Sequence, residues 1–157
     1  MSRSIGPGLR KQWRRACVLP GGKWLFSRML ALRVPYTGGL GAVVQSLAPG
    51  HCLVKLRDSR RLRNHLHSIH AMALANLGEM ATGLALLNGL PDDTRAILTG
   101  FSIEYLKKAR GTLLAQCHCS VPVSNAPGDL DISGEIRDSD GAVVATVIAR
   151  WHIGPEA

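Results

Sequence analysis

The sequence is poor in aromatic residues and in cysteine, and its first 33 residues contain no Asp or Glu. Aromatic side chains make up only 4% of the 157 residues, too few for a module that binds single-stranded nucleic acid by stacking many bases. The four cysteines are too scattered for a disulfide scaffold and show no zinc-finger spacing. We therefore expect reduced thiols, a cytoplasmic protein and no nucleic-acid partner.

Positive charge is concentrated at the N-terminus. Residues 1–33 hold eight of the 19 Lys and Arg residues and none of the 11 Asp and Glu residues, so the rest of the chain is neutral. The simplest interpretation is a solvated basic arm that leads into one amphipathic helix over residues 23–33. The alternative is contact with a membrane surface or another polyanion, because Trp13, Trp24 and other apolar side chains lie between the basic ones. The segment lacks the unbroken apolar core of a secretory signal.

Turn-forming residues divide the chain near residue 39. Pro35 stops the N-terminal helix, and Gly38 and Gly39 follow it. This pattern predicts a basic arm with a short helix over residues 1–38 and a main domain over residues 39–157. Alternating apolar and polar residues predict the strands of this domain, the first two joined in a hairpin. The predicted strands span residues 41–48, 51–57, 95–106, 112–121, 130–137 and 142–153.

One long helix is predicted between the second and third strands. Apolar residues and helix formers continue from Ser68, a good N-cap, to Asn88. Gly89 and Pro91 then end the helix. About 21 residues make a helix of about 30 Å, and it is apolar nearly all round, so other elements must surround it. We favour protein over lipid surroundings because a membrane span would bury Glu79. Short turns between the later strands favour antiparallel pairing, which predicts an α+β fold with a sheet curved around the helix.

Two features of this helix indicate chemistry. Glu79 lies in an apolar segment, where a carboxylate without a partner costs several kcal/mol, and histidines crowd the start of the helix. His70 and Glu79 are nine residues apart, which places them on opposite sides of the helix and about 13 Å apart along it. Two copies related by a twofold axis could instead bring the start of one helix against the Glu79 of the other. The sequence therefore indicates a homodimer.

Simpler interpretations exist for both features. Glu79 could be satisfied by Asn76, by the Thr82 hydroxyl or by a basic side chain. His65 and His67 could be surface or capping residues. Together with His70 they could instead suggest a metal site. No paired carboxylate or thiolate lies near them in sequence, so we predict no metal ion.

The segment NHLHSIHAMALANLGEMA, residues 64–81, resembles the signature of hotdog-fold acyl-CoA thioesterases of the phenylacetate-degradation type. That signature has an Asn, a His six positions later followed by two glycines, and an Asp or Glu nine positions after the His. Asn64, His70 and Glu79 reproduce this spacing, and the strand order around the helix matches from about residue 39 to 153. The segments GGKWLFSRML and IEYLKKARG are similar to those of an uncharacterised bacterial hotdog subfamily.

The resemblance implies a hotdog fold, in which an antiparallel sheet of about six strands wraps around one long central helix, here with a short N-terminal helix. It also implies roles for single residues. The Ala71 N–H would polarise the thioester carbonyl, His70 would hold the turn, and Asn64 would orient the carbonyl or the attacking water. Glu79 of the partner subunit would act as general base or attack directly. We assign substrate binding to Met72, Asn76, Lys107, Lys108 and Arg110, the last three at the CoA phosphates.

The implied function is hydrolysis of an acyl-CoA thioester by a homodimer or a dimer of dimers, without metal or other cofactor. Ala71 and Met72 stand where the family has two glycines, which narrows the backbone's freedom and puts a Met side chain near the thioester. Glu79 stands where Asp is commoner and adds one methylene of reach. These departures keep open a second hypothesis, an acyl-CoA or fatty-acyl binding module that kept the fold and lost efficient hydrolysis.

Overall fold

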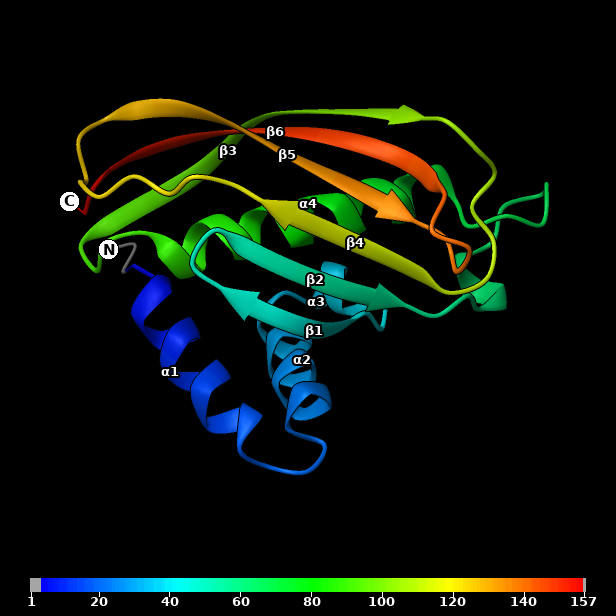
Figure 1. The fold of residues 1–157 in the computed structure, drawn as a ribbon, viewed down its shortest axis with the longest axis horizontal. Helices are drawn as coiled ribbons and strands as arrows, with labels where there is room; N and C mark the ends of the chain where they lie inside the picture. Colours follow the sequence, from blue (N-terminus) through cyan, green and yellow to red (C-terminus); the bar gives the residue numbers. More distant parts are fainter. Residues whose placement is uncertain (1–3, 157) are drawn as a thin grey trace.

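The computed structural model describes residues 4–156, in which one antiparallel sheet wraps around a long helix and three further helices pack beside it (Figure 1). The helices are α1 (Gly6–Cys17), α2 (Gly22–Arg33), α3 (Pro35–Gly38) and α4 (Ala71–Gly89), with a short 3-10 turn at Arg60–Leu62. The strands are β1 (Val43–Ala48), β2 (His51–Leu56), β3 (Thr94–Tyr105), β4 (Leu113–His118), β5 (Gly128–Arg137) and β6 (Val143–Pro155).

The six strands follow the order β1-β2-β4-β5-β6-β3, and every neighbouring pair is antiparallel. This confirms the predicted α+β fold and all six predicted strands, whose ends differ by a few residues. The first two strands form the predicted hairpin. Gly50 turns the chain there with φ 71°, and a Cβ at this position would lie 2.2 Å from the Cys119 carbonyl oxygen. β1 and β3 are the edges of the sheet.

Helix α4 is buried along most of its length because the sheet covers one side and the N-terminal helices cover part of the other (Figure 1). Leu77, Ala85 and Leu86 are fully buried. Gly78 permits a close approach to β6, since a Cβ there would lie 2.6 Å from a methyl carbon of Val147. Protein therefore surrounds this apolar helix, as the sequence predicted.

Helix α4 begins at Ala71 and its N-cap is His70, so the prediction of Ser68 as N-cap was wrong. Ile69 still pairs with Arg63 in a β-bridge and donates its N–H to the Ala109 carbonyl at 2.8 Å. Ser68 is buried in the preceding loop. The chain therefore stays extended for two residues beyond Ser68, held by contacts that are distant in sequence.

Residues 6–17 form helix α1, where the sequence analysis predicted a solvated arm. Leu9, Trp13 and Ala16 lie on one face at helical spacing and are buried. Trp13 packs edge-on against Phe26 of α2, with ring centroids 5.0 Å apart. Helix α2 confirms the helix predicted over residues 23–33, and α1 is an additional helix that joins the same hydrophobic core.

Arg10 fixes α1 to the end of α4. Its guanidinium donates to the carbonyls of Asn88 and Leu90, at 2.8 and 3.0 Å, and pairs with the Asp92 carboxylate. Carbonyls at the end of a helix lack partners within the helix, and the helix dipole favours a positive charge there. One of the basic N-terminal residues therefore has a structural role.

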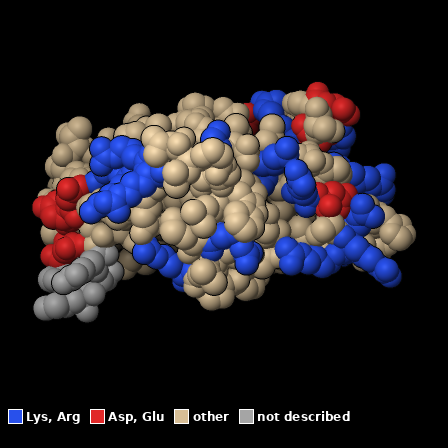
Figure 2. Space-filling model, turned by 90° about the horizontal axis from the view of Figure 1, so that it is seen from below, with Lys and Arg blue, Asp and Glu red and all other residues tan. Residues whose placement is uncertain are grey.

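The other basic side chains of the N-terminal helices are exposed: Lys11, Arg14, Arg15, Lys23, Arg28 and Arg33. Figure 2 shows basic side chains spread over the side of the molecule that carries α1 and α2, with uncharged surface between them. Exposed apolar side chains of the same segment include Val18, Trp24 and Leu32. Within residues 4–156, no helix is both long and apolar enough to cross a membrane. Contact of this segment with a membrane surface stays an alternative interpretation.

Candidate functional site

A pocket of about 360 Å³ lies at the start of α4. Its walls come from the loop before α4, from the first turns of α4 and from the turn after β3. Four of the predicted site residues line it: Asn64, Ala71, Lys107 and Lys108. The fold therefore brings together a loop and a turn that are far apart in sequence.

Asn64 holds the loop before α4 in a tight turn. Its side-chain oxygen accepts the N–H groups of Leu66 and Ser68, at 2.9 and 3.2 Å, and the Ser68 hydroxyl at 3.2 Å. Its backbone carbonyl accepts the N–H of His67, which adopts the left-handed conformation with φ 55°. Because three donors occupy the side-chain oxygen, the amide NH₂ is the group that Asn64 can offer to a ligand.

His70 closes the first turn of α4. Its Nδ1 accepts the N–H of Met72 at 3.0 Å, so the neutral ring carries its proton on Nε2. The Ala71 N–H forms no hydrogen bond within residues 4–156 and lies at the positive end of the helix dipole. The Met72 side chain is exposed beside it. The start of α4 thus offers one free backbone donor to a carbonyl oxygen.

Tyr105 lines the same pocket and was missed by the sequence analysis. Its hydroxyl donates to the Ala71 carbonyl at 3.1 Å, which ties the end of β3 to the start of α4. Partial burial raises the pKa of the Tyr105 hydroxyl. The only signal in the sequence is an aromatic residue at a strand end before a Lys-Lys turn, and tyrosine is common in strands for packing reasons alone.

The three basic residues after β3 have different surroundings. Lys107 pairs with Asp138 at 2.6 Å, and this hydrogen bond raises the pKa of Lys107. Arg110 donates to the Leu66 carbonyl at 3.4 Å and so contacts the loop before α4. Lys108 is exposed and forms no ion pair with any residue between positions 4 and 156. Lys108 is therefore the cation most available to an anionic ligand.

Glu79 lines a second pocket, of about 400 Å³, between α2 and α4. Its carboxylate forms no hydrogen bond or ion pair in the described part of the chain, and burial raises its pKa. Asn76 instead accepts a hydrogen bond from Thr37 of α3 at 2.9 Å. The Thr82 hydroxyl donates to backbone carbonyls of the preceding turn. Neither of these two residues satisfies the carboxylate, contrary to the simpler interpretation.

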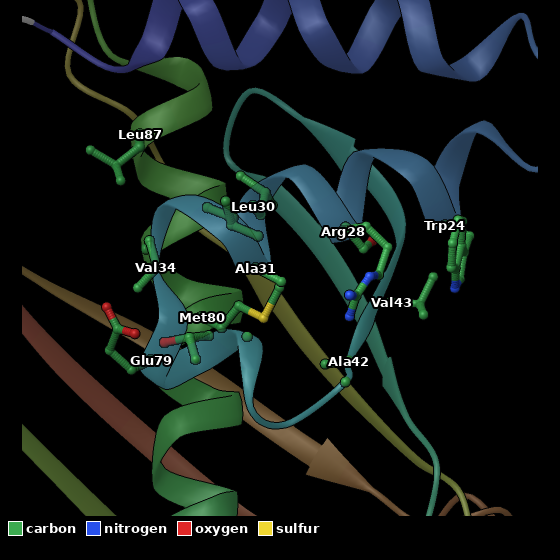
Figure 3. A pocket seen from close by; sticks show the side chains of 16 residues that line it. Trp24, Arg28, Leu30, Ala31, Val34, Ala42, Val43, Glu79, Met80 and Leu87 are labelled. Atoms are coloured by element: carbon green, nitrogen blue, oxygen red, sulfur yellow. The ribbon is translucent and has the colours of Figure 1, made fainter.

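Helix α2 supplies the wall of this second pocket that faces α4 (Figure 3). Most of the lining is apolar and includes Leu30, Ala31, Val34, Met80, Leu84 and Leu87. Figure 3 shows Glu79 at one end and Trp24 at the other, with Met80 and Ala31 between them. The sequence analysis assigned α2 to the basic arm and missed this role, because the pocket exists only where α2 packs against α4.

Within one chain the predicted site is divided between two places. Asn64, Ala71 and the lysines lie at the start of α4, whereas Glu79 lies about 12 Å further along the helix axis. In the described range, 4–156, no three His, Cys, Asp or Glu side chains gather in a way that could hold a metal ion. The composite site formed by two chains stays a prediction.

Residues 22–153 match the family described as DUF4442, a domain of unknown function. The chain belongs to this family. The DUF4442 region begins with α2 and ends in β6, so it contains both pockets, and α1 precedes it. No protein with a curated description matches the chain.

Several solved structures are similar to this DUF4442 chain over most of its length. The structural-genomics protein APC5556 is 26% identical, with a TM-score of 0.82 over 94% of this chain and 99% of its own. PA5026 from Pseudomonas aeruginosa, a protein of unknown function described as a probable thioesterase, is 17% identical, with a TM-score of 0.75 over 88% and 97% of the two chains. A hypothetical thioesterase from Streptococcus pneumoniae, solved with coenzyme A, is 18% identical, with a TM-score of 0.62 over 74% and 88%.

These similarities confirm the hotdog fold that the signature of residues 64–81 implied. Two of the proteins that share this fold are described as thioesterases, one as probable and one as hypothetical. The sheet around α4 positions the start of this helix beside the turn after β3.

Proposed function

We propose that this DUF4442 protein is an acyl-CoA thioesterase, which hydrolyses a CoA thioester to a carboxylic acid and CoA. The observation that carries the proposal is the Glu79 carboxylate, which is partly buried and has no hydrogen-bond partner within residues 4–156. An unpaired carboxylate in apolar surroundings costs stability, and such groups cluster at functional sites. Similar structures described as a probable thioesterase and as a hypothetical thioesterase, the latter solved with coenzyme A, support the same reaction class.

The proposed reaction uses two copies of the chain. At the start of α4 in one copy, the Ala71 N–H donates to the thioester carbonyl oxygen and the Asn64 NH₂ orients the carbonyl or the water. The partner subunit's Glu79 approaches the carbonyl carbon from the other side. As a general base, it takes a proton from water, whose oxygen bonds to the carbon while the C–S bond breaks and the thiolate leaves. As a nucleophile, its oxygen bonds to the carbonyl carbon while the C–S bond breaks and the thiolate leaves, and water then hydrolyses the mixed anhydride.

Strand β3 supports the pairing of two copies. It is an edge strand of twelve residues that pairs with β6 alone in the described chain. Ile97 and Leu98 expose 53% and 36% of their surface on it. A long edge strand with exposed apolar side chains is a template for pairing with another chain. A homodimer joined along β3 would continue the sheet across both copies, and a dimer of dimers would need a further contact.

The turn after β3 supports CoA as the carrier of the acyl group. Lys108 has no anionic partner in the chain between residues 4 and 156, and Lys107 and Arg110 lie beside it in sequence. Phosphate groups bind such cations through charge-assisted hydrogen bonds. In this proposal the phosphates lie over the turn, and the thioester reaches the start of α4.

The test follows loss of thioester ultraviolet absorbance with short, medium, long and aromatic acyl-CoAs, which avoids a thiol reagent that exposed Cys17 would consume. We expect hydrolysis by the wild type that Glu79→Gln and Asn64→Ala each lower by about 10² or more. Glu135→Gln is the matched control, because Glu135 lies on a different pocket over the sheet. Hydrolysis that neither substitution lowers, or no hydrolysis of any substrate, would reject the proposal.

A binding module without hydrolysis is the second candidate, and one observation favours it. His70 engages the Met72 N–H, so only the Ala71 N–H of the first two in α4 is free to hold an oxyanion. Tight binding of an acyl-CoA without turnover, unchanged by Glu79→Gln, would favour this second function.

A further inference from the structure

The pocket between α2 and α4 extends away from Glu79 as an elongated apolar groove (Figure 3). Along α4 its lining runs from Glu79 to Leu87, eight residues or about 12 Å of helix. Its volume of about 400 Å³ lies within the range of pockets that hold small molecules.

Small residues leave the groove open. Gly38, Gly41, Ala42 and Gly83 all line it and have little or no side chain. A Cβ on Gly38 would lie 2.8 Å from the Ala31 side chain, so glycine is needed where α3 meets α2. The helices can therefore approach one another without filling the space between them.

The groove offers few polar groups to an occupant. The Ser27 hydroxyl already donates to the Lys23 carbonyl and accepts the Val44 N–H. The Thr37 hydroxyl donates to Asn76. The polar groups still available are the Glu79 carboxylate on α4 and, on the α2 side, the side chains of Arg28 and Trp24. The middle of the groove is therefore suited to a chain of methylene groups.

We propose that this groove binds a straight aliphatic acyl chain that runs along α4, with its carbonyl end at Glu79 and its methyl end toward Leu87. An extended chain advances about 1.2 Å per bond, as the backbone does, so 12 Å accommodates about ten carbons. The substrate class is then medium-chain aliphatic rather than aromatic. The position of the carbonyl rests on the proposed function, in which the thioester bound at one copy reaches the partner subunit's Glu79. Binding of the chain itself requires no hydrolysis.

The test is isothermal titration of the full-length protein with decanoic acid and, separately, with phenylacetic acid. We expect decanoic acid to bind about tenfold tighter, the effect of burying roughly two more methylenes. Ala42→Leu and Met80→Phe narrow the groove from its two sides. Each substitution should lower the affinity for decanoic acid by about tenfold or more. Ala142→Leu, in the turn between β5 and β6 and outside the groove, is the matched control and should bind as the wild type does.

Thermal unfolding of each variant shows whether it is folded before its affinity is compared. Equal affinity for the two acids, or decanoic acid binding that neither Ala42→Leu nor Met80→Phe weakens, would overturn the inference. A protein that binds decanoic acid in the expected way but hydrolyses no thioester would reject the proposed function and leave this inference standing. The two failures are therefore distinguishable.

Discussion

The side-chain oxygen of Asn64 accepts both the backbone N–H and the hydroxyl of Ser68, each at 3.2 Å. The Leu66 N–H is a third donor to the same oxygen, at 2.9 Å. The oxygen of Asn64 therefore shapes the loop, while its NH₂ is left for a ligand. Substitutions can separate these two roles.

Asn64→Asp keeps the oxygen that shapes the loop and removes the NH₂. We expect the free energy of unfolding to stay within about 1 kcal/mol of the wild type, while kcat/KM for the best acyl-CoA falls by about 10² to 10³. Denaturant titration and steady-state kinetics measure the two quantities. Ser68→Ala is the control, since it removes a donor to the oxygen and leaves the NH₂ in place, so it should cost about 1 kcal/mol and little activity. Equal activity losses in the two variants would contradict the assignment.

Lys108 and Lys107 should contribute unequally to CoA binding. Lys107 already pairs with Asp138 at 2.6 Å, whereas Lys108 has no such partner in residues 4–156. We expect Lys108→Ala to raise KM by about two- to fivefold at low salt, a change that shrinks as salt screens the charge. Lys107→Ala is the matched variant and should change KM less. A larger effect at Lys107 would show that the ion pair opens when substrate binds.

Arg10→Ala should destabilise the fold although Arg10 lines neither pocket. It removes hydrogen bonds to the carbonyls of Asn88 and Leu90 at the end of α4. We expect a loss of about 1–3 kcal/mol in the free energy of unfolding, measured by urea titration. Arg14→Ala, an exposed residue of the same helix, is the control and should change it by less than about 0.5 kcal/mol. Similar values for the two variants would mean that α1 does not stabilise α4 through Arg10.

Glu79→Gln should stabilise the protein at alkaline pH. Burial raises the pKa of Glu79 in the folded state above its ordinary value of 4.5. Between the unfolded and folded pKa values the folded state binds more protons, so this group's contribution to stability falls as pH rises through that interval. Glutamine stays neutral and removes this dependence. The Tm of the variant should exceed that of the wild type by more at about pH 8 than at about pH 5. A difference in Tm that does not change with pH would contradict the burial of the charge.

Ile97→Lys should separate the proposed dimer without unfolding the chain. Ile97 is 53% exposed on the edge strand β3, where a charge would repel a second copy. We expect sedimentation velocity to show a dimer for the wild type and a monomer for the variant, with thioester hydrolysis lost along with the dimer. Ile148→Lys, at an exposed position of the interior strand β6, is the matched control and should leave the assembly intact. An unchanged dimer in Ile97→Lys would place the contact elsewhere.

Part of the candidate site could be selected from the sequence because the family signature depends on spacing along the chain. Asn64, His70 and Glu79 match the intervals of the signature that residues 64–81 resemble, and the assignment of the lysines follows from the same resemblance. The groove along α2 and the hydroxyl of Tyr105 could not be selected in this way. Each forms only when segments far apart in sequence pack against α4.

The sequence by itself determined the six strands and the long apolar helix, because alternation and helix period are local properties. The pairing of β2 with β4 and of β3 with β6 joins strands that are distant in sequence. Tertiary structure alone decided where α4 begins and whether α1 exists as a packed helix. Ile69 stays extended because it bonds to the Ala109 carbonyl, and α1 docks because Trp13 meets Phe26 and Arg10 meets the end of α4. These contacts join residues that are far apart in sequence, so the local sequence pattern does not predict them.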